Sequence, residues 1–168
     1  GQTGVEAIDR APRFLKEVLL FPLVEGRAFV HDLYLDGGWP AVDRAYEDPP
    51  ASTEQVLHPA LYPEGGPLAI EAPDLSSTLG TMWPTLRVGV LGELLTREML
   101  EAYLPEEEAA EAAAGWGGDV LLTSRNAESG AGLLILITRW DNLRQAQDFA
   151  LAFRPYGLAE AVKLRGWV

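Results

Sequence analysis

The chain has 168 residues, 48% of them apolar, which is enough for one domain with a buried core that needs no disulfide or metal. Its 25 Asp and Glu residues outnumber its 13 Lys and Arg residues, and the formal net charge of −12 disfavours nucleic acid and anionic membrane surfaces as partners. The absence of cysteine excludes disulfides, thiolate zinc sites, cysteine-ligated iron–sulfur clusters and a cysteine nucleophile.

The first part of the chain, about residues 11–60, is predicted to be helical. Apolar residues recur at helical spacing over residues 11–20, and Pro22 is expected to end that helix and begin a second one. The second helix runs to about Leu35, and Gly37 and Gly38 stop it.

This second helix is apolar on nearly all sides. Its acidic residues Glu25, Asp32 and Asp36 share one narrow face, and apolar side chains cover the other directions: Leu23, Val24, Ala28, Phe29, Val30, Leu33, Tyr34 and Leu35. We therefore expect the helix to lie in the middle of the domain.

A short third helix is predicted from Trp39 to Tyr46. Asp48-Pro49-Pro50 ends it, because a residue before proline is pushed out of the helical region. Ser52, with Gln55 three residues later, then has the form of a capping box that begins another helix.

The second part, about residues 66–168, mixes strands with helices. Residues 67–73 are predicted to form an edge strand between two prolines, and residues 85–90 alternate as a strand with Leu86, Val88 and Val90 on one face. A helix follows over residues 91–102. Another begins at Pro105 with three glutamates and stops at Gly115.

Residues 119–125 and 133–138 are predicted to pair as a hairpin, and the continuous apolar run of the latter (LLILIT) indicates the central strand. Asp141 is the expected N-cap of a last helix, whose predicted buried stripe is Leu143, Ala146, Phe149, Ala150 and Phe153. The tail from Tyr156 to Val168 is predicted to add a strand.

This order of elements predicts an α+β fold, in which an N-terminal helical half precedes a small antiparallel sheet packed with helices. We expect a single domain over residues 1–168. Because the chain begins with Gly1 and not with Met, we also expect it to be a fragment of a longer precursor. No apolar run approaches the ~20 residues that cross a bilayer, so no direct membrane span is predicted.

The sequence contains no self-contained catalytic, cofactor or metal site. Its two histidines, His31 and His58, are not spaced as H-E-x-x-H, and a metal site using both would need carboxylates brought together by the fold. A hydrolase that uses Ser52 or Thr53 with His58 is a further alternative, but G-x-S-x-G is absent and helix capping already accounts for Ser52.

The glycine-rich run from Gly115 to Asp119 lacks both common phosphate-binding signatures, and its aspartate opposes an anion. The run is predicted to cap a helix and turn the backbone into a strand. Trp116 and Trp140 are expected in the core, with the lining of a ligand groove as the alternative.

Several motifs occur in a fixed order and together resemble a known group. They are the run FPLVEGRAFVHDLYLDGGWPAVDRAYEDPPASTEQVLHPALY, the pair Gly92-Glu93, the segment AAAGWGGD, and Trp140-Asp141 before an Ala/Phe helix. From Ala11 to Phe153 the chain resembles the C-terminal part of exported bacterial and archaeal proteins related to zinc metallopeptidases of the gluzincin type. The most specific piece is the P-P-x-S-T-E-Q-x-L-H-P run.

In that group the H-E-x-x-H motif lies upstream, so the resemblance implies that zinc would be bound in a preceding segment and that this chain binds no cofactor itself. It also implies an extracytoplasmic location and a supporting role, as the wall of a cleft or as a structural motif, for Pro49, Pro50, Ser52, Thr53, Glu54, Gln55, His58 and Pro59.

The function implied by the resemblance is the non-metal-binding C-terminal portion of a zincin-like exported protein. The alternative is a non-enzymatic accessory or assembly subunit that binds other proteins through its apolar helical half. In either case the expected partner is a protein, which is the upstream fragment of the same precursor or a larger complex.

Overall fold

The computed structural model describes residues 10–154 of the chain. They belong to two compact units, Gly1–Gly66 and Pro67–Val168. The boundary at Gly66 coincides with the predicted change from the helical part to the α+β part. The single domain stays a prediction, and each unit is described by itself below.

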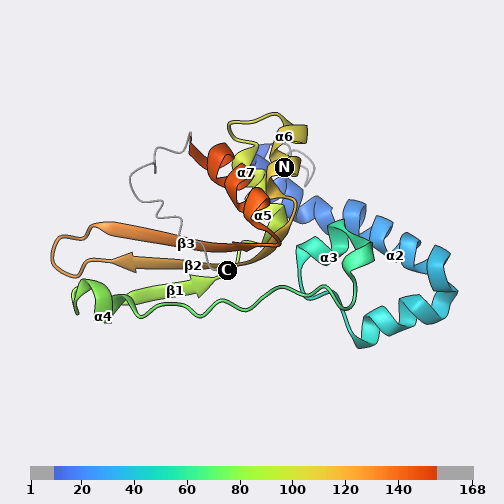
Figure 1. The fold of residues 1–168 in the computed structure, drawn as a ribbon, viewed down its shortest axis with the longest axis horizontal. Coiled ribbons are helices and arrows are strands. Elements are labelled where there is room, and N and C mark those ends of the chain that lie inside the picture. The colour runs from blue at the N-terminus through green and yellow to red at the C-terminus, as the bar shows by residue number, and fades with distance from the viewer. Residues whose placement is uncertain (1–9, 155–168) are drawn as a thin grey trace, which may run out of the picture. The chain divides into compact units, whose positions relative to one another are not determined.

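The first unit is built on α2 (Arg13–Glu47), which consists of two arms (Figure 1). The backbone leaves the helical region at Gly37 and at Gly38, which has φ 62° and ψ −162°. This conformation is open to glycine and strained for other residues. The two glycines therefore divide α2 into a first arm (residues 13–36) and a second arm (residues 39–47), as the sequence predicts.

Pro22 does not end a helix, and that expectation was wrong. It lies inside the first arm, where it lacks the N–H that would otherwise bond to the carbonyl of Val18. The side chain of Val18 is 42% exposed, so water can reach this turn. The cost of the proline, about 3 kcal/mol, is borne within a helix long enough to continue past it.

The second arm ends at Glu47, before the two prolines, as predicted. The chain continues into α3 (Thr53–Leu57) and the 3-10 turn η1 (Pro59–Leu61), and both pack on α2. Phe29, Ala41 and Val42 are the buried apolar residues of α2, and the ring of Phe29 meets that of Tyr62 edge-on at 5.3 Å. This contact joins η1 to the first arm.

The first arm was expected to be buried on most sides, and the structure corrects this. Phe29 is its buried apolar side chain, whereas Leu23 is 68% and Leu35 69% exposed. Apolar residues on most sides of a helix favour burial of that helix. Whether the same chain buries these residues depends on how the helix packs against the other elements.

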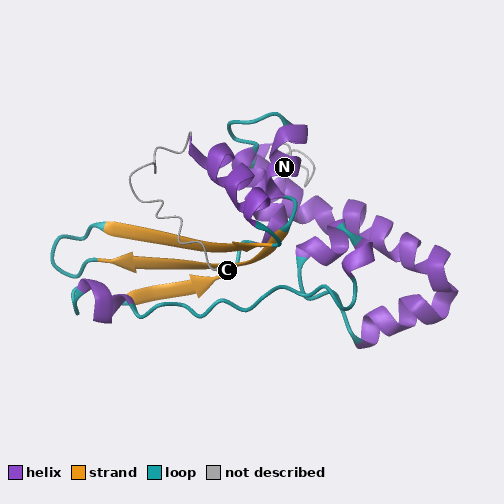
Figure 2. Ribbon diagram, viewed as in Figure 1, coloured by secondary structure: helices purple, strands orange, loops and turns teal. Residues whose placement is uncertain are grey.

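The second unit is built on a three-stranded antiparallel sheet in the order β1-β2-β3, which confirms the α+β class. The strands are β1 (Thr85–Gly89), β2 (Trp116–Arg125) and β3 (Gly132–Trp140), and Figure 2 shows the β2–β3 hairpin with its connecting loop. The hairpin confirms the predicted pairing of these segments.

The central strand is β2, not the LLILIT strand β3, which corrects the prediction. A continuous apolar run fits a strand covered on both faces, but in β3 one face carries Ile135 and Ile137 in a cluster with Leu122, while Leu134 on the other face is 59% exposed. Apolar residues on both faces of a strand depend on what packs against those faces. They do not require a paired strand at each of its two edges.

Residues 67–73 do not form the predicted edge strand. The backbone N–H of Leu68 donates to the carbonyl of Gly117 at 2.7 Å, but the segment forms no ladder with the sheet. It leads to a short helix, α4 (Leu75–Leu79), capped by Asp74. The Ser76 hydroxyl donates to Asp74 and lowers the pKa of its carboxyl below the ordinary 3.8.

Three helices pack together in the second unit: α5 (Gly92–Leu100), α6 (Glu106–Ala113) and α7 (Leu143–Phe153). Their core consists of small alanines from α6 against large side chains, and Phe149 stacks between Trp140 at 4.6 Å and Phe153 at 5.3 Å. This explains why an alanine-rich helix, with little apolar surface of its own, is placed between bulky partners.

The start of α7 differs from the prediction. Asn142, not Asp141, is the N-cap, and its side chain accepts a hydrogen bond from the backbone N–H of Gln145 at 3.1 Å. Leu143 is 68% exposed and does not belong to the buried stripe, although Phe149 does. Leu143 is the first residue of α7. The strand predicted over Tyr156–Val168 lies outside the described residues.

Candidate functional site

The run from Pro49 to Pro59 carried most of the sequence-based argument, and the structure gives Ser52 and Gln55 clear structural roles. The Ser52 hydroxyl accepts a hydrogen bond from the Gln55 backbone N–H at 3.3 Å, which confirms Ser52 as the N-cap of α3. The Gln55 side chain does not complete the capping box, because it bonds elsewhere.

Gln55 is 1% exposed and joins three segments. Its side-chain oxygen accepts from the Ala51 N–H at 2.7 Å, and its amide nitrogen donates to the carbonyls of Pro63 at 3.0 Å and Leu61 at 3.5 Å. A buried amide with all these partners fixes how the loop around η1 lies on α3. The neighbouring Glu54 is 4% exposed.

The other members of the run lie nearer the surface. Pro49 and His58 are exposed, and Pro50, Ser52, Thr53 and Pro59 are half-buried. His58 ends α3 as its C-cap, with its backbone N–H donating to the Glu54 carbonyl. Their predicted role as the wall of a cleft stays a prediction.

A hollow of about 320 Å³ lies in the first unit, beside this run. It is lined by both arms of α2 together with Tyr62 and Pro63: Leu33, Asp36, Ala41, Arg44, Glu47, Asp48, Tyr62 and Pro63. None of the eight predicted site residues lines it. The hollow exists because the kink at Gly37 and Gly38 turns the second arm away from the line of the first.

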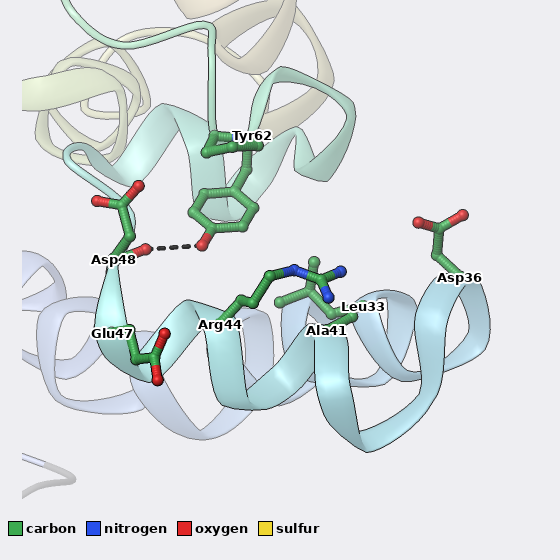
Figure 3. Close-up of a pocket in the computed structure, with 8 residues that line it drawn as sticks. Leu33, Asp36, Ala41, Arg44, Glu47, Asp48 and Tyr62 are labelled. Atoms are coloured by element: carbon green, nitrogen blue, oxygen red, sulfur yellow. Dashed lines mark hydrogen bonds between the residues drawn. The ribbon is translucent and has the colours of Figure 1, made fainter.

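Figure 3 shows Arg44 reaching from the second arm toward Leu33 and Ala41, beneath the ring of Tyr62. A Cβ atom added to Gly37 would lie 3.7 Å from the Arg44 guanidinium, so this cation sits at the C-terminal end of the first arm, where a helix favours positive charge. The Tyr62 hydroxyl donates to the Asp48 backbone carbonyl at 2.6 Å and closes the hollow on one side.

The lining of the hollow gives it little chemistry. It contains one cation, three carboxylates and no serine, threonine, histidine or lysine, so it offers no nucleophile beyond the tyrosine hydroxyl that already bonds to Asp48. We interpret the hollow as a consequence of the kink in α2. Arg44 and Tyr62 stabilise this kink.

The histidines do not form a metal centre in the described part of the chain. His31 Nδ1 lies 3.8 Å from Asp32 Oδ1, and both side chains are more than half exposed. Across residues 10–154, no three His, Cys, Asp or Glu side chains are grouped so that they could hold a metal ion.

The second unit contains two polar clusters that the sequence did not single out. In the first, the buried Asp119 accepts hydrogen bonds from the backbone N–H groups of Leu91 at 2.9 Å and Gly92 at 2.8 Å, and from the Trp116 ring at 3.0 Å. The carboxylate thus caps the start of α5 from a strand far away in sequence. Trp116 is 1% exposed, which confirms it as a core residue.

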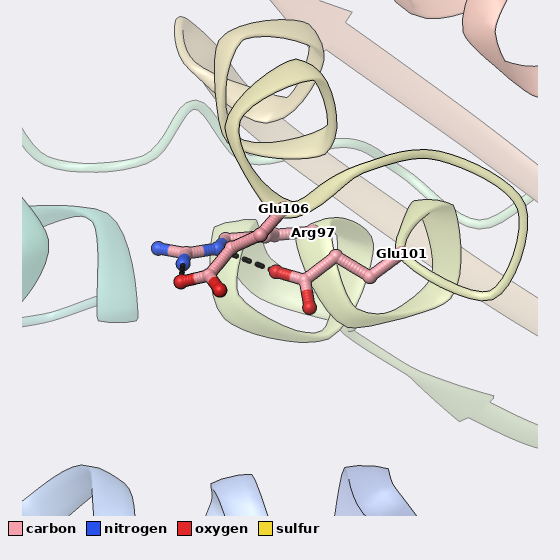
Figure 4. Close-up of polar contacts among 3 residues, drawn as sticks. All are labelled: Arg97, Glu101 and Glu106. Atoms are coloured by element: carbon pink, nitrogen blue, oxygen red, sulfur yellow. Dashed lines mark hydrogen bonds and ion pairs between the residues drawn. The ribbon is translucent and has the colours of Figure 1, made fainter.

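In the second cluster, Arg97 bridges two helices (Figure 4). Its guanidinium lies 2.9 Å from the carboxylate of Glu101 and 3.0 Å from that of Glu106 at the start of α6. The Glu101 side chain is 1% exposed, so its charge needs this partner. Every polar group in the two clusters is explained by holding α5, α6 and β2 together.

A further feature of the described residues is the apolar surface on the first arm of α2. Leu20, Leu23, Arg27, Val30 and Tyr34 follow one another at alternating steps of three and four, which places them along one face of the helix. We call these five residues the α2 stripe. Leu20 is 41%, Leu23 68%, Val30 39% and Tyr34 44% exposed.

No helix formed by residues 10–154 combines the length and the apolarity that crossing a membrane requires. The 3-4 spacing of the α2 stripe is the one by which helices pack on each other. The sequence feature that indicates the α2 stripe is the distribution of apolar residues around the helix. From this distribution the helix was predicted to lie in the middle of the domain.

Comparison with protein families gives a match to a domain of unknown function. A family model described as a domain of unknown function (DUF8575) matches residues 85–166, just under half of the chain. The match begins at the first residue of β1 and takes in α5, α6, β2, β3 and α7, but not the helical unit that carries the α2 stripe. No curated protein and no solved structure matches the chain.

Proposed function

We propose that the chain is a non-enzymatic accessory or assembly module that binds another protein through the α2 stripe. The observation that carries the proposal is the run of large apolar side chains, 39–68% exposed, at helix-packing spacing on a long helix. A partner helix laid along the first arm would cover these side chains and remove them from water.

The charges beside the stripe define the partner. Arg27 lies within the stripe, His31 lies beside it, and both are exposed. Within the described residues Arg27 makes no ion pair, although the protein as a whole carries a net charge of −12. The matching partner is an amphipathic helix with apolar residues at the same spacing and acidic residues along its flanks.

The energetics support reversible binding. Full burial of a Leu, Val or Tyr-sized side chain contributes about 1.5–3 kcal/mol, so covering the exposed parts on both helices contributes roughly 10 kcal/mol in total. Association itself costs about 4 kcal/mol or more. The remainder, about 6 kcal/mol or less, corresponds to a dissociation constant of tens of micromolar or weaker.

The zincin-like function rests on the sequence resemblance, which places its zinc motif upstream. A preceding segment with H-E-x-x-H would then be one source of the partner helix. Zinc-dependent peptidase activity in this chain alone would contradict the non-enzymatic role.

The test uses two synthetic amphipathic helices that share leucines at 3-4 spacing and differ in having glutamate or lysine at the flanking positions. Fluorescence anisotropy should show binding of the glutamate helix with a dissociation constant of tens of micromolar, and at least about tenfold weaker binding of the lysine helix. Arg27→Glu should reverse this preference. Equal binding of both helices, or no binding of either, would overturn the proposal.

A matched pair of variants locates the site. Leu23 on α2 and Leu143 on α7 are both 68% exposed. Leu23→Ser should weaken binding of the glutamate helix about tenfold, which corresponds to the loss of about 1.4 kcal/mol of apolar burial. Leu143→Ser should leave it unchanged, since Leu143 lies outside the stripe.

A further inference from the structure

A second exposed apolar surface lies at the edge of the sheet in the other unit. β1 is the edge strand, and it pairs with β2 alone among the described strands. All five residues of β1 are exposed, and Leu86 is 58%, Val88 56% and, just after the strand, Val90 64% exposed. Within residues 10–154, one edge of β1 therefore presents unpaired backbone groups beside exposed apolar side chains.

The apolar layer of the sheet is continuous up to this edge. Val88 is the register partner of Leu122, which is fully buried, and Leu122 is in turn the partner of Ile135. The layer beneath the sheet holds Leu122 in a cluster with Leu75 and Val120. A further strand beside β1 would extend this layer by one row and cover Val88.

The features that commonly protect an edge strand are largely missing here. β1 contains no proline, lysine or acidic residue, and its protection consists of its short length, the charge of Arg87 and an irregularity between Thr85 and Arg87. From Arg87 to Gly89 the pairing with β2 is regular, so a strand could be added along this part.

Arg87 decides which strand fits. It points to the face opposite Val88, since side chains alternate along a strand, and within the described residues it makes no ion pair. A second copy of β1 paired antiparallel about its centre would set Arg87 against Arg87, and like charges in opposing positions are destabilising. The complementary strand carries an acidic residue at that position.

From this geometry we propose that β1 is a docking site for an extended segment of another protein. The segment adds to the free edge as a strand, with apolar residues beside Val88 and Val90 and an acidic residue opposite Arg87. Its backbone supplies the hydrogen bonds and the charge pair sets the preference. This site is separate from the α2 stripe.

The probe is a capped peptide, Val-Thr-Val-Glu-Val-Thr-Val, compared with the peptide that has lysine in place of glutamate. Titration of the full chain, followed by NMR, should shift the backbone amides of β1 with the glutamate peptide and give at least about fivefold weaker binding with the lysine peptide. Arg87→Glu should reverse the order. A peptide N-methylated on alternate nitrogens of its docking edge should not bind, because strand addition needs those N–H groups.

Variants of matched exposure distinguish the two edges. Val88→Thr should weaken binding about threefold or more, whereas Leu134→Thr on β3, where Leu134 is 59% exposed, should not change it. Loss of binding in Leu134→Thr alone would move the site to β3 and overturn the proposal. Leu23→Ser on the α2 stripe should leave peptide binding intact, so failure of one proposal is separable from failure of the other.

Self-association is a further outcome of the test. Sedimentation of the full chain should show no dimer that depends on Val88. A concentration-dependent dimer that Val88→Thr abolishes, together with no binding of either peptide, would identify a second copy as the occupant and overturn the heterologous strand.

Discussion

Single buried side chains connect separate segments of this protein. Asp119 in β2 accepts hydrogen bonds from the N–H groups of Leu91 and Gly92, and Gln55 joins α3 to the carbonyls of Leu61 and Pro63. Both side chains are nearly inaccessible to water. An acidic or amide residue in such a position is explained by the backbone groups it satisfies, before any catalytic role is considered.

Gly118 provides a test at the same scale. Its φ is +149°, and a Cβ atom there would lie 2.4 Å from the Leu68 carbonyl oxygen, which belongs to the segment crossing the start of β2. Gly118→Ala should therefore destabilise the second unit by about 2 kcal/mol or more, through backbone strain and displacement of Leu68. Urea unfolding followed by tryptophan fluorescence measures the change.

Gly89 is the matched control in β1. Nothing lies within 4 Å of the position of its Cβ, so Gly89→Ala should change stability by less than about 0.5 kcal/mol. Similar losses in both variants would show that glycine is needed in these strands for flexibility, and not at Gly118 for space.

The glycine-rich run from Gly115 to Asp119 shows which features of single residues can be predicted from the sequence. The change from helix to strand at Gly115 was predictable, because glycine adopts positive φ after a helix and no apolar periodicity continues past it. The need for Gly118 was not, since it depends on Leu68, and the same holds for Asp119, whose partners lie in another element. Local chemistry is readable from the sequence, but contacts between distant segments are not.

At the scale of elements, the most informative helix is α2, because its two prolines occupy different positions. Pro22 lies within the first arm, where it removes a backbone hydrogen bond, whereas Pro40 follows the break at Gly38 and lies in the first turn of the second arm. First-turn N–H groups have no helical partner, so proline costs little there. The expectation that Pro22 ends a helix was wrong because a proline inside a helix lowers the stability of the helix but does not prevent it from forming.

Pro22→Ala should stabilise the first arm by up to about 3 kcal/mol, because it restores the missing bond and removes the clash with the preceding turn. Pro40→Ala should produce a change below about 0.5 kcal/mol. Circular dichroism at 222 nm during thermal unfolding reports both. If Pro40→Ala stabilises as much as Pro22→Ala, the second arm begins earlier than Trp39 and the two prolines are equivalent.

The periodicity of apolar residues predicted nearly every helix of the described chain. It did not predict which elements each helix packs against. The 3.6-residue pattern of α5, α6 and α7 was read correctly because these helices cover one another with narrow apolar faces. The wide apolar face of α2 and the continuous apolar run of β3 were both read as central. Neither is central, since Leu23 and Leu35 of α2 and Leu134 of β3 are exposed and β3 lies at an edge of the sheet.

At the scale of the whole molecule, the chain consists of two compact units with separate buried clusters. Phe29, Ala41 and Val42 pack in the first, while the second has one cluster around Leu100 and Phe149 and another on the sheet. Each unit also carries one of the two proposed binding surfaces. The matched family model covers most of the second unit and none of the first, in agreement with this division.

A native-state hydrogen-exchange experiment tests whether the two units are stabilised independently. Gln55→Ala leaves the Ala51 N–H and the Pro63 carbonyl without their partner and should cost the first unit about 2–3 kcal/mol. Amides of α2 and α3 should then exchange faster by a factor of about 30 or more, while those of β2 and β3 keep their rates, because their bonds and core belong to the other unit. Gly118→Ala should give the opposite pattern, with accelerated exchange in β2 and β3 and unchanged rates in α3. Equal acceleration of all four elements in either variant would contradict independence, since it would mean that the chain opens as one cooperative structure.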